Sequence, residues 1–107
     1  MTRDEILTIY ESAIAMAGLE RKGKTMPYTS SNGYMFSQLN KDHEIGIRLS
    51  KLDTEKFDKE FGAKPFMSYG AKMREYVLIP KELLGQVEVL SALLGKGFEH
   101  VNSLPPK

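Results

Sequence analysis

The sequence predicts an α+β fold in which a helix, three strands, a helix, two strands and a last helix follow one another, with a mostly antiparallel sheet packed by helices. Three observations lead to this fold. A capped amphipathic helix opens the chain, alternating apolar runs meet at Asn32-Gly33, and an apolar stripe at helical spacing fills the end of the chain. The turns between the first three strands are too short for a crossover helix, so those strands must be antiparallel.

The first helix is predicted to begin at a capping box. In the pattern Thr-x-x-Glu, here Thr2 to Glu5, the hydroxyl and the carboxylate each bind a free backbone amide of the first turn. At about 100° per residue, the predicted buried face comprises Ile6, Tyr10, Ala13 and Ala17, with Ile9, Ile14 and Met16 on its flanks. Gly18 is predicted to end the helix.

Three strands are predicted next. The first lies around Tyr28 and the second covers residues 34–39, and both alternate apolar with polar residues. Asn32-Gly33 between them indicates a type I′ hairpin turn, because both central residues of that turn need φ above zero. In the third strand, residues 44–49, every second residue is isoleucine or leucine, which predicts a strand that is buried on one side.

A short second helix follows, with Asp53 as its predicted N-cap. Leu52 before the cap and Phe57 after it would form a hydrophobic staple, with Phe61 one turn later on the same face. Gly62 is predicted to end this helix.

Two more strands are predicted around the turn at Gly70, one over residues 65–69 and the other over 74–79. The second of them is apolar on both faces, so it is predicted to be the central strand of the sheet. Pro80 has no amide hydrogen and should end it.

The last helix is defined by an apolar stripe at helical spacing. Its members are Leu83, Val87, Leu90, Leu94, Phe98 and Val101. Glycines interrupt the stripe and weaken a helix by about 1 kcal/mol each relative to alanine. Two interpretations stay open: the helix breaks near Gly85, or Gly97 permits a close approach to the sheet.

Length and composition indicate one ordinary folded domain that covers residues 1–107. Fifteen Lys and Arg residues balance fourteen Asp and Glu residues, which leaves no broad positive field for a phosphate backbone and disfavours nucleic acid as a partner. The acidic residues Asp4 and Glu5 do not fit a signal peptide, and no apolar run reaches the ~18 residues of a membrane span. We therefore expect a soluble, cytoplasmic protein without a membrane segment.

No catalytic or metal-binding motif is evident. Cysteine is absent, and His43 and His100 lack the spacing of a metal cluster such as H-E-x-x-H. Neither a G-x-S-x-G elbow nor a glycine-rich phosphate loop occurs. The six methionines suit core filling, with a soft-metal site as the alternative. We expect no catalytic residue, no bound metal and no cofactor.

Two groups of basic residues are the candidates for a binding surface. Arg48, Lys72, Arg74 and Tyr76 form the only basic and aromatic grouping that a hairpin could bring onto one face. A loop adds Arg21, Lys22 and Lys24. For both groups the simpler explanation is solvated surface, with long Lys and Arg stems covering the sheet.

Five segments carry a resemblance to a known family: NGYMF at 32–36, the helix around Phe57, KMREYVLIP at 72–80, ELL at 82–84 and SLPPK at 103–107. Together they resemble the TfoX/Sxy N-terminal domain family, with a weaker likeness to YjbR-type domains. The resemblance implies a type III secretion chaperone-like architecture and a place among bacterial competence regulators. Full-length TfoX-type regulators carry a second domain, so the regulatory role does not transfer directly.

The leading functional hypothesis is a non-enzymatic interaction or regulatory domain that binds a protein partner or a second copy of itself. It rests on the resemblance and on a sheet that helices cover on one side, which would leave the other side available. The alternatives are a nucleic-acid-associated regulator, using Arg21, Lys22, Lys24, Lys72 and Arg74, and a small-ligand-binding protein.

Overall fold

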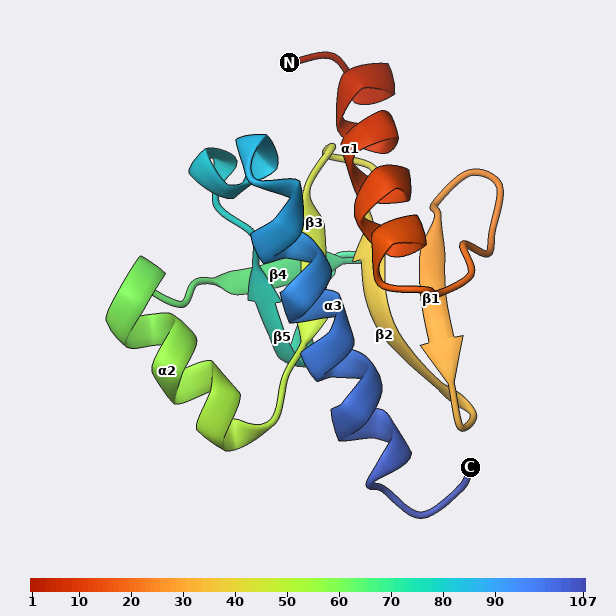
Figure 1. The fold of residues 1–107 in the computed structure, drawn as a ribbon, viewed down its shortest axis with the longest axis vertical. Helices are drawn as coiled ribbons and strands as arrows, with labels where there is room; N and C mark the ends of the chain where they lie inside the picture. The colour runs from red at the N-terminus through yellow and green to blue at the C-terminus, as the bar shows by residue number, and fades with distance from the viewer.

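The computed structural model describes all 107 residues and has an α+β fold with a five-stranded sheet (Figure 1). The elements in chain order are α1 (Arg3–Met16), β1 (Tyr28–Ser31), β2 (Tyr34–Leu39), β3 (Ile45–Arg48), α2 (Lys51–Phe61), β4 (Pro65–Ser68), β5 (Ala71–Leu78), the 3₁₀ helix η1 (Lys81–Gly85) and α3 (Val87–Asn102). The predicted class is confirmed, and the predicted order is followed except for the added 3₁₀ helix.

The sheet has the strand order β1-β2-β3-β5-β4, and every neighbouring pair is antiparallel. The Asn32-Gly33 hairpin is confirmed, with φ of 57° and 83° at the two central residues and Ser31 paired with Tyr34. The predicted central position of the strand at 74–79 is confirmed in that β5 pairs with β3 on one side and β4 on the other, while the middle place of the sheet belongs to β3.

Helix α1 begins as predicted. The Glu5 amide donates to Thr2 Oγ1 at 3.2 Å, and the Thr2 amide donates back to Glu5 Oε1 at 2.9 Å. Its buried residues are Ile6, Tyr10, Ala13 and Ile14. The flank prediction for Met16 is wrong, since this side chain is 56% exposed.

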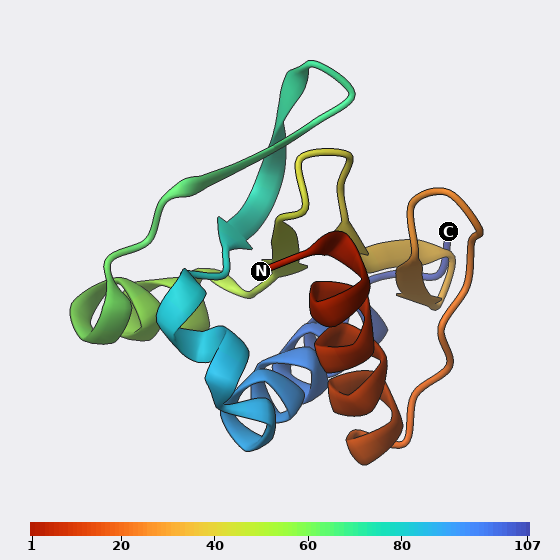
Figure 2. The ribbon, with the colours of Figure 1, turned by 90° about the horizontal axis from the view of Figure 1, so that it is seen from above.

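The helices α1 and α3 pack together on one side of the sheet, as Figure 2 shows from above. Both interpretations of the glycines in the last helix apply. The helical path is interrupted where η1 ends at Gly85, before α3 begins at Val87. A Cβ on Gly97 would then lie only 2.9 Å from the carbonyl oxygen of Arg48, so this glycine allows α3 to sit directly on β3.

A β-bulge in β2 turns two neighbouring side chains toward the helices. Thr29 pairs with Ser37 but Ser30 pairs with Met35, which leaves Phe36 as the extra residue. Phe36 packs edge-on against Phe98 of α3, while Ser37 shares short hydrogen bonds with Tyr10 and Thr29. Burial raises the pKa of the Tyr10 hydroxyl, which stays neutral within this network.

Helix α2 begins earlier than predicted, with Ser50 as its N-cap. The Ser50 hydroxyl accepts from the amide of Asp53 at 3.1 Å, so the predicted cap at Asp53 is wrong. Leu52 lies inside the helix and is 61% exposed, so it makes no staple with the buried Phe57. Serine and aspartate are both common N-caps, and here the hydroxyl of Ser50 is the group that meets a free amide.

Replacing Ser50 with alanine should lower the free energy of unfolding by about 1 kcal/mol, because the Asp53 amide loses its acceptor. Replacing Asp53 with alanine should cost only a few tenths of a kcal/mol, from the favourable position of its charge in the first turn. Urea unfolding of both variants measures the difference. A larger loss at Asp53 would restore the original assignment of the cap.

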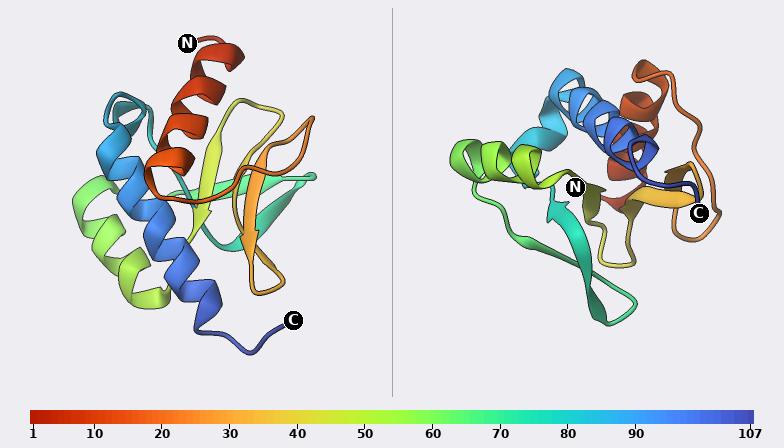
Figure 3. Two further views of the ribbon diagram at one scale, coloured as in Figure 1. Left: turned by 45° about the vertical axis from the view of Figure 1, so that its right-hand side comes forward. Right: turned by 90° about the horizontal axis from the view of Figure 1, so that it is seen from below.

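The β4–β5 hairpin bends away from the helices and closes part of the other side of the sheet (Figures 2 and 3). Phe66 of β4 is completely buried there, stacked on Tyr76 at a ring distance of 5.8 Å. Gly46 of β3 makes room for it, since a Cβ on Gly46 would lie 2.3 Å from the Phe66 ring. The aromatic pair forms a second, smaller core.

Side-chain hydrogen bonds seal this second core by joining β4 and its turn to β2. The Ser68 hydroxyl donates to Gln38, and Gln38 Nε2 donates to the Tyr69 hydroxyl at 3.0 Å. Asn40 Nδ2, just beyond β2, donates to the carbonyl oxygen of Met67 at 2.7 Å. The expectation of an open sheet face is therefore wrong for this part of β2 and β3, because the chain's own hairpin covers it.

Candidate functional site

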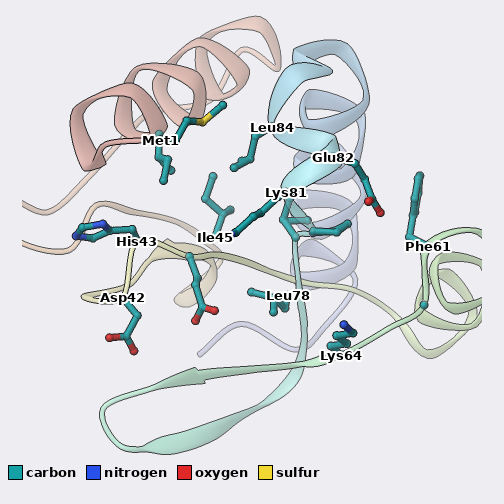
Figure 4. Close-up of a pocket in the computed structure, with 15 residues that line it drawn as sticks. Met1, Asp42, His43, Ile45, Phe61, Lys64, Leu78, Lys81, Glu82 and Leu84 are labelled. Carbon is teal, nitrogen blue, oxygen red and sulfur yellow. The ribbon is translucent and has the colours of Figure 1, made fainter.

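A hollow with a volume of about 820 Å³ lies where four parts of the chain meet (Figure 4). These are the start of α1, the turn between β2 and β3, the end of α2, and the segment that leads from β5 into η1. Its floor is apolar, formed by Ile6, Ile45, Phe61, Leu78, Ile79 and Leu84. Its rim carries charges of both signs.

The acidic part of the rim is held by the turn between β2 and β3. Asn40 Oδ1 accepts from the amides of Asp42 and Glu44, each at 2.9 Å, and His43 between them has a φ of 63°. An Asn side chain that closes a turn in this way is a common device for fixing a short loop. Asp42 and Glu44 are thereby held beside the hollow.

The basic part of the rim comes from two chain reversals. Gly62 ends α2 and leads to Lys64, and Pro80 ends β5 and leads into η1 at Lys81. In Figure 4, Lys81 lies near the centre of the hollow, while Asp42 and Lys64 lie toward opposite sides. Neither Lys64 nor Lys81 forms an ion pair with a carboxylate of the chain. Their charges are free to meet a ligand.

The lining of the hollow combines an apolar floor with charged side chains on its rim. Its lining contains no serine, threonine or cysteine that could act as a nucleophile. No group of three or more His, Asp or Glu residues lies together in a way that could hold a metal ion. An apolar group of a ligand would bury its surface against the floor, and charged groups on either side of that apolar group would contact the charged side chains of the rim.

The predicted grouping of Arg48, Lys72, Arg74 and Tyr76 is not assembled into one surface. Arg48 and Tyr76 are paired in register between β3 and β5. Tyr76 is only 8% exposed, and its hydroxyl donates to the carbonyl oxygen of Met35. Lys72 and Arg74 are exposed on β5, and neither lines the hollow.

Arg48 is engaged by Glu75, a residue in the left-handed backbone region with φ of 68°. Arg48 Nε donates to Glu75 Oε1 at 3.0 Å, and His100 Nε2 lies 3.4 Å from the other carboxylate oxygen. Burial alone would raise the pKa of Glu75, but the hydrogen bonds and charge of Arg48, together with His100, lower it below its ordinary value. This cluster ties β3, β5 and α3 together.

Glu75→Gln should make the protein less stable at neutral pH and should flatten its stability profile under acid conditions. The folded state holds the Glu75 proton less tightly than the unfolded chain does, so the carboxylate stabilises the fold above a pH of about 4.3 and loses this effect as the pH falls further. Urea unfolding at pH 7 and pH 3 measures the change. Glu55→Gln, at an exposed position on α2, is the control, and an equal response of both variants would contradict the assignment.

The second predicted basic group, in the loop before β1, is partly neutralised. Arg21 Nε lies 3.6 Å from Glu11 Oε2, and Lys22 donates to the Ser30 hydroxyl at 2.9 Å. Lys24 is exposed. Ion pairs of this exposed kind contribute little to stability, but they reduce the positive charge that a phosphate backbone would meet.

The residues of the hollow were not identified as a site from the sequence. They come from four separated segments, and no motif links them. The available signals were the turn residues Asn40, Gly62 and Pro80, which mark where the chain reverses but not that the reversals meet.

None of the helices combines the length with the apolar character that crossing a membrane requires. The chain matches no family model, and comparisons with curated proteins and with solved structures found no similar protein. The likeness to TfoX N-terminal domains therefore rests on the five segments of the sequence quoted above.

Proposed function

We propose that this chain is a non-enzymatic interaction domain with a regulatory role in the cytoplasm, of the kind that its resemblance to TfoX N-terminal domains implies. The observation that supports the proposal is the hollow beside α1 and α2, with its apolar floor and unpaired rim charges. The reverse of the sheet, which was the expected contact surface, is partly occupied by the β4–β5 hairpin.

The partner that fits the hollow is an amphipathic segment of another protein. An apolar side chain of that segment would bury against Phe61 and Leu78, which are only partly covered in this chain. A positive group of the partner would face Asp42 and Glu44, and a negative group would face Lys64. Apolar burial would supply affinity, and the charges would orient the segment.

Capture from a bacterial lysate with matched variants tests the proposal. Phe61→Glu and Leu52→Glu both place an acid on α2, but only Phe61 lines the hollow. Lys81→Glu reverses a rim charge at an exposed position, without touching the core. A stoichiometric partner should be retained by wild type and by Leu52→Glu, and lost from the other two.

Circular dichroism of each variant establishes that it is folded before the capture is interpreted. A partner retained by both Phe61→Glu and Lys81→Glu would exclude the hollow as the contact surface. A protein that stays monomeric with no enriched partner would contradict the interaction role itself.

A small ligand is the second candidate, favoured by the size of the hollow. Small-molecule sites commonly span about 300–1,000 Å³, and the hollow measures about 820 Å³. A ligand that binds only the folded state raises the midpoint of thermal unfolding. A screen should therefore find compounds that raise the midpoint of wild type but not of Phe61→Glu.

The nucleic-acid alternative depends on the basic loop and β5, where Lys24, Lys72 and Arg74 are exposed. Binding through phosphate contacts must weaken steeply with salt. A filter-binding titration at low and high salt decides the matter, since binding that is absent or insensitive to salt removes this candidate.

A further inference from the structure

The chain's own segment Leu104–Lys107 lies against the tip of the β1–β2 hairpin. The Tyr34 hydroxyl donates to the carbonyl oxygen of Pro105 at 2.6 Å. Asn32 Nδ2 donates to the carbonyl oxygens of Val101 and Leu104, each at 2.9 Å. The Asn32 carbonyl oxygen in turn accepts from the Lys107 amide at 3.2 Å. Apart from the hydrogen bond to Val101 of α3, each of these contacts involves the main chain of the segment.

The hairpin tip donates to the carbonyl oxygens of Leu104 and Pro105, a backbone group that proline retains. The Leu104 amide bonds back to the carbonyl oxygen of Val101, and the next available amide is that of Lys107, which meets Asn32. Pro105 and Pro106 between them have no amide hydrogen. Both prolines are exposed, so an amide at either place would bond to water; what proline contributes is a chain already restricted to an extended form, which loses less conformational entropy when it is bound.

The hairpin tip is shaped to admit a chain at this place. A Cβ on Gly33 would lie 2.8 Å from the Lys107 carbonyl oxygen, so only glycine allows the approach. The Tyr34 ring beside it has two cations over it, the Arg48 guanidinium at 5.4 Å and the Lys107 ammonium at 5.6 Å from the ring centre.

We propose that Asn32, Gly33 and Tyr34 form a recognition site for proline-proline segments of a partner protein. In the absence of that partner, the chain's own Leu104–Lys107 segment occupies the site. This hairpin-tip site is separate from the hollow, and its occupant is recognised by backbone groups and an aromatic ring. Proline-rich segments lose little conformational entropy on binding, which suits a site with few contacts.

Exchange of the occupant does not require the fold to open. Pro105, Pro106 and Lys107 are exposed, and Leu104 is only partly buried. Only Ser103 stands between the end of α3 and the segment, and Val101, which is fully buried on the core side of that helix, stays in place when the segment leaves. The chain's own segment thus acts as a competitor that a partner must displace.

The test uses the full chain and an acetylated, amidated peptide of sequence Ser-Leu-Pro-Pro-Lys. Pro105→Gly with Pro106→Gly loosens the resident segment, because glycine restores the entropy that proline removes. During titration, the backbone amide signals of Asn32, Gly33 and Tyr34 should shift to saturation in this variant. Wild type should bind more weakly, since its resident segment competes.

Two controls make the result specific. Adding Tyr34→Phe, which removes one hydrogen-bond donor, should weaken binding about fivefold. A peptide with both prolines replaced by alanine should also bind more weakly, because the free alanine peptide has more backbone entropy to lose on binding. The proposal is overturned if the loosened variant shows no saturable shift at the hairpin tip, or if the alanine peptide binds as well as the proline peptide.

Discussion

Gly97→Ala should lower the free energy of unfolding by about 1–3 kcal/mol, the usual cost of forcing an extra carbon into a well-packed interior. The added Cβ would lie 2.9 Å from the Arg48 carbonyl oxygen and 3.0 Å from the Phe36 ring. The carbonyl belongs to β3 in the middle of the sheet, so it cannot move aside without disturbing the ladder. Helix α3 would have to lift away from the sheet.

Gly95→Ala is the matched control on the same helix. A Cβ on Gly95 meets nothing within 4 Å, so alanine should stabilise the helix by up to about 1 kcal/mol through its higher propensity. Urea unfolding of both variants should therefore give changes of opposite sign. Equal stability of the two would contradict the close contact between α3 and β3.

Phe66→Ala should cost about 3–5 kcal/mol, as expected for removing a fully buried aromatic side chain. Phe66 is completely buried, stacks on Tyr76 and fills the space above Gly46. Its loss would empty the second core and leave the β4–β5 hairpin held mainly by its hydrogen bonds to β3 and β2.

Hydrogen exchange distinguishes this loosening from global destabilisation. In Phe66→Ala the amides of β4 and β5 should exchange faster relative to those of α1 and α3, because the hairpin opens separately. Met67→Ala, at the next residue and 45% exposed, should cost less than about 1 kcal/mol and leave the pattern unchanged. Unaltered protection of the hairpin in Phe66→Ala would show that the second core does not hold it.

The parts of the fold that the sequence predicted correctly depend on neighbours along the chain. The capping box at Thr2 and Glu5, the Asn32-Gly33 turn and the apolar stripe of α3 each involve residues within one or two turns of one another. Such signals act through backbone geometry that local residues determine, so they could be identified before the structure.

The errors arose where distant segments decide the outcome. Glu75, inside β5, has a φ of 68°, and nothing in the sequence signals this conformation. Pro65 pairs with Val77 but Met67 pairs with Lys72, so β5 has more residues than β4 between these two pairs, as in a β-bulge. The bend that folds β4 and β5 over the sheet was therefore not predicted. The apolar character of 74–79 on both faces was correctly identified, and it reflects a strand that lies between β3 and β4 and contributes to two separate cores.

The candidate site was predictable only in part. Composition and motifs led to the expectation of binding without catalysis, and this expectation remains a proposal. The basic and aromatic candidates were chosen by residue type, but Arg48 donates a hydrogen bond to the Glu75 carboxylate and Tyr76 donates one to the carbonyl oxygen of Met35. The hollow depends on how α2 and the β2–β3 turn approach the start of η1, which periodicity and turn signals do not specify.

The bent β4–β5 hairpin also determines how the sheet ends. Outer strands normally offer a row of free backbone groups on which other chains can add a strand or aggregate. Here β4 begins with Pro65, which has no amide hydrogen, and the Met67 carbonyl oxygen is already bound by Asn40. At the opposite border, Tyr28 of β1 is bridged by Lys22. Each border thus offers fewer free backbone groups to an added strand, which disfavours edge-to-edge aggregation.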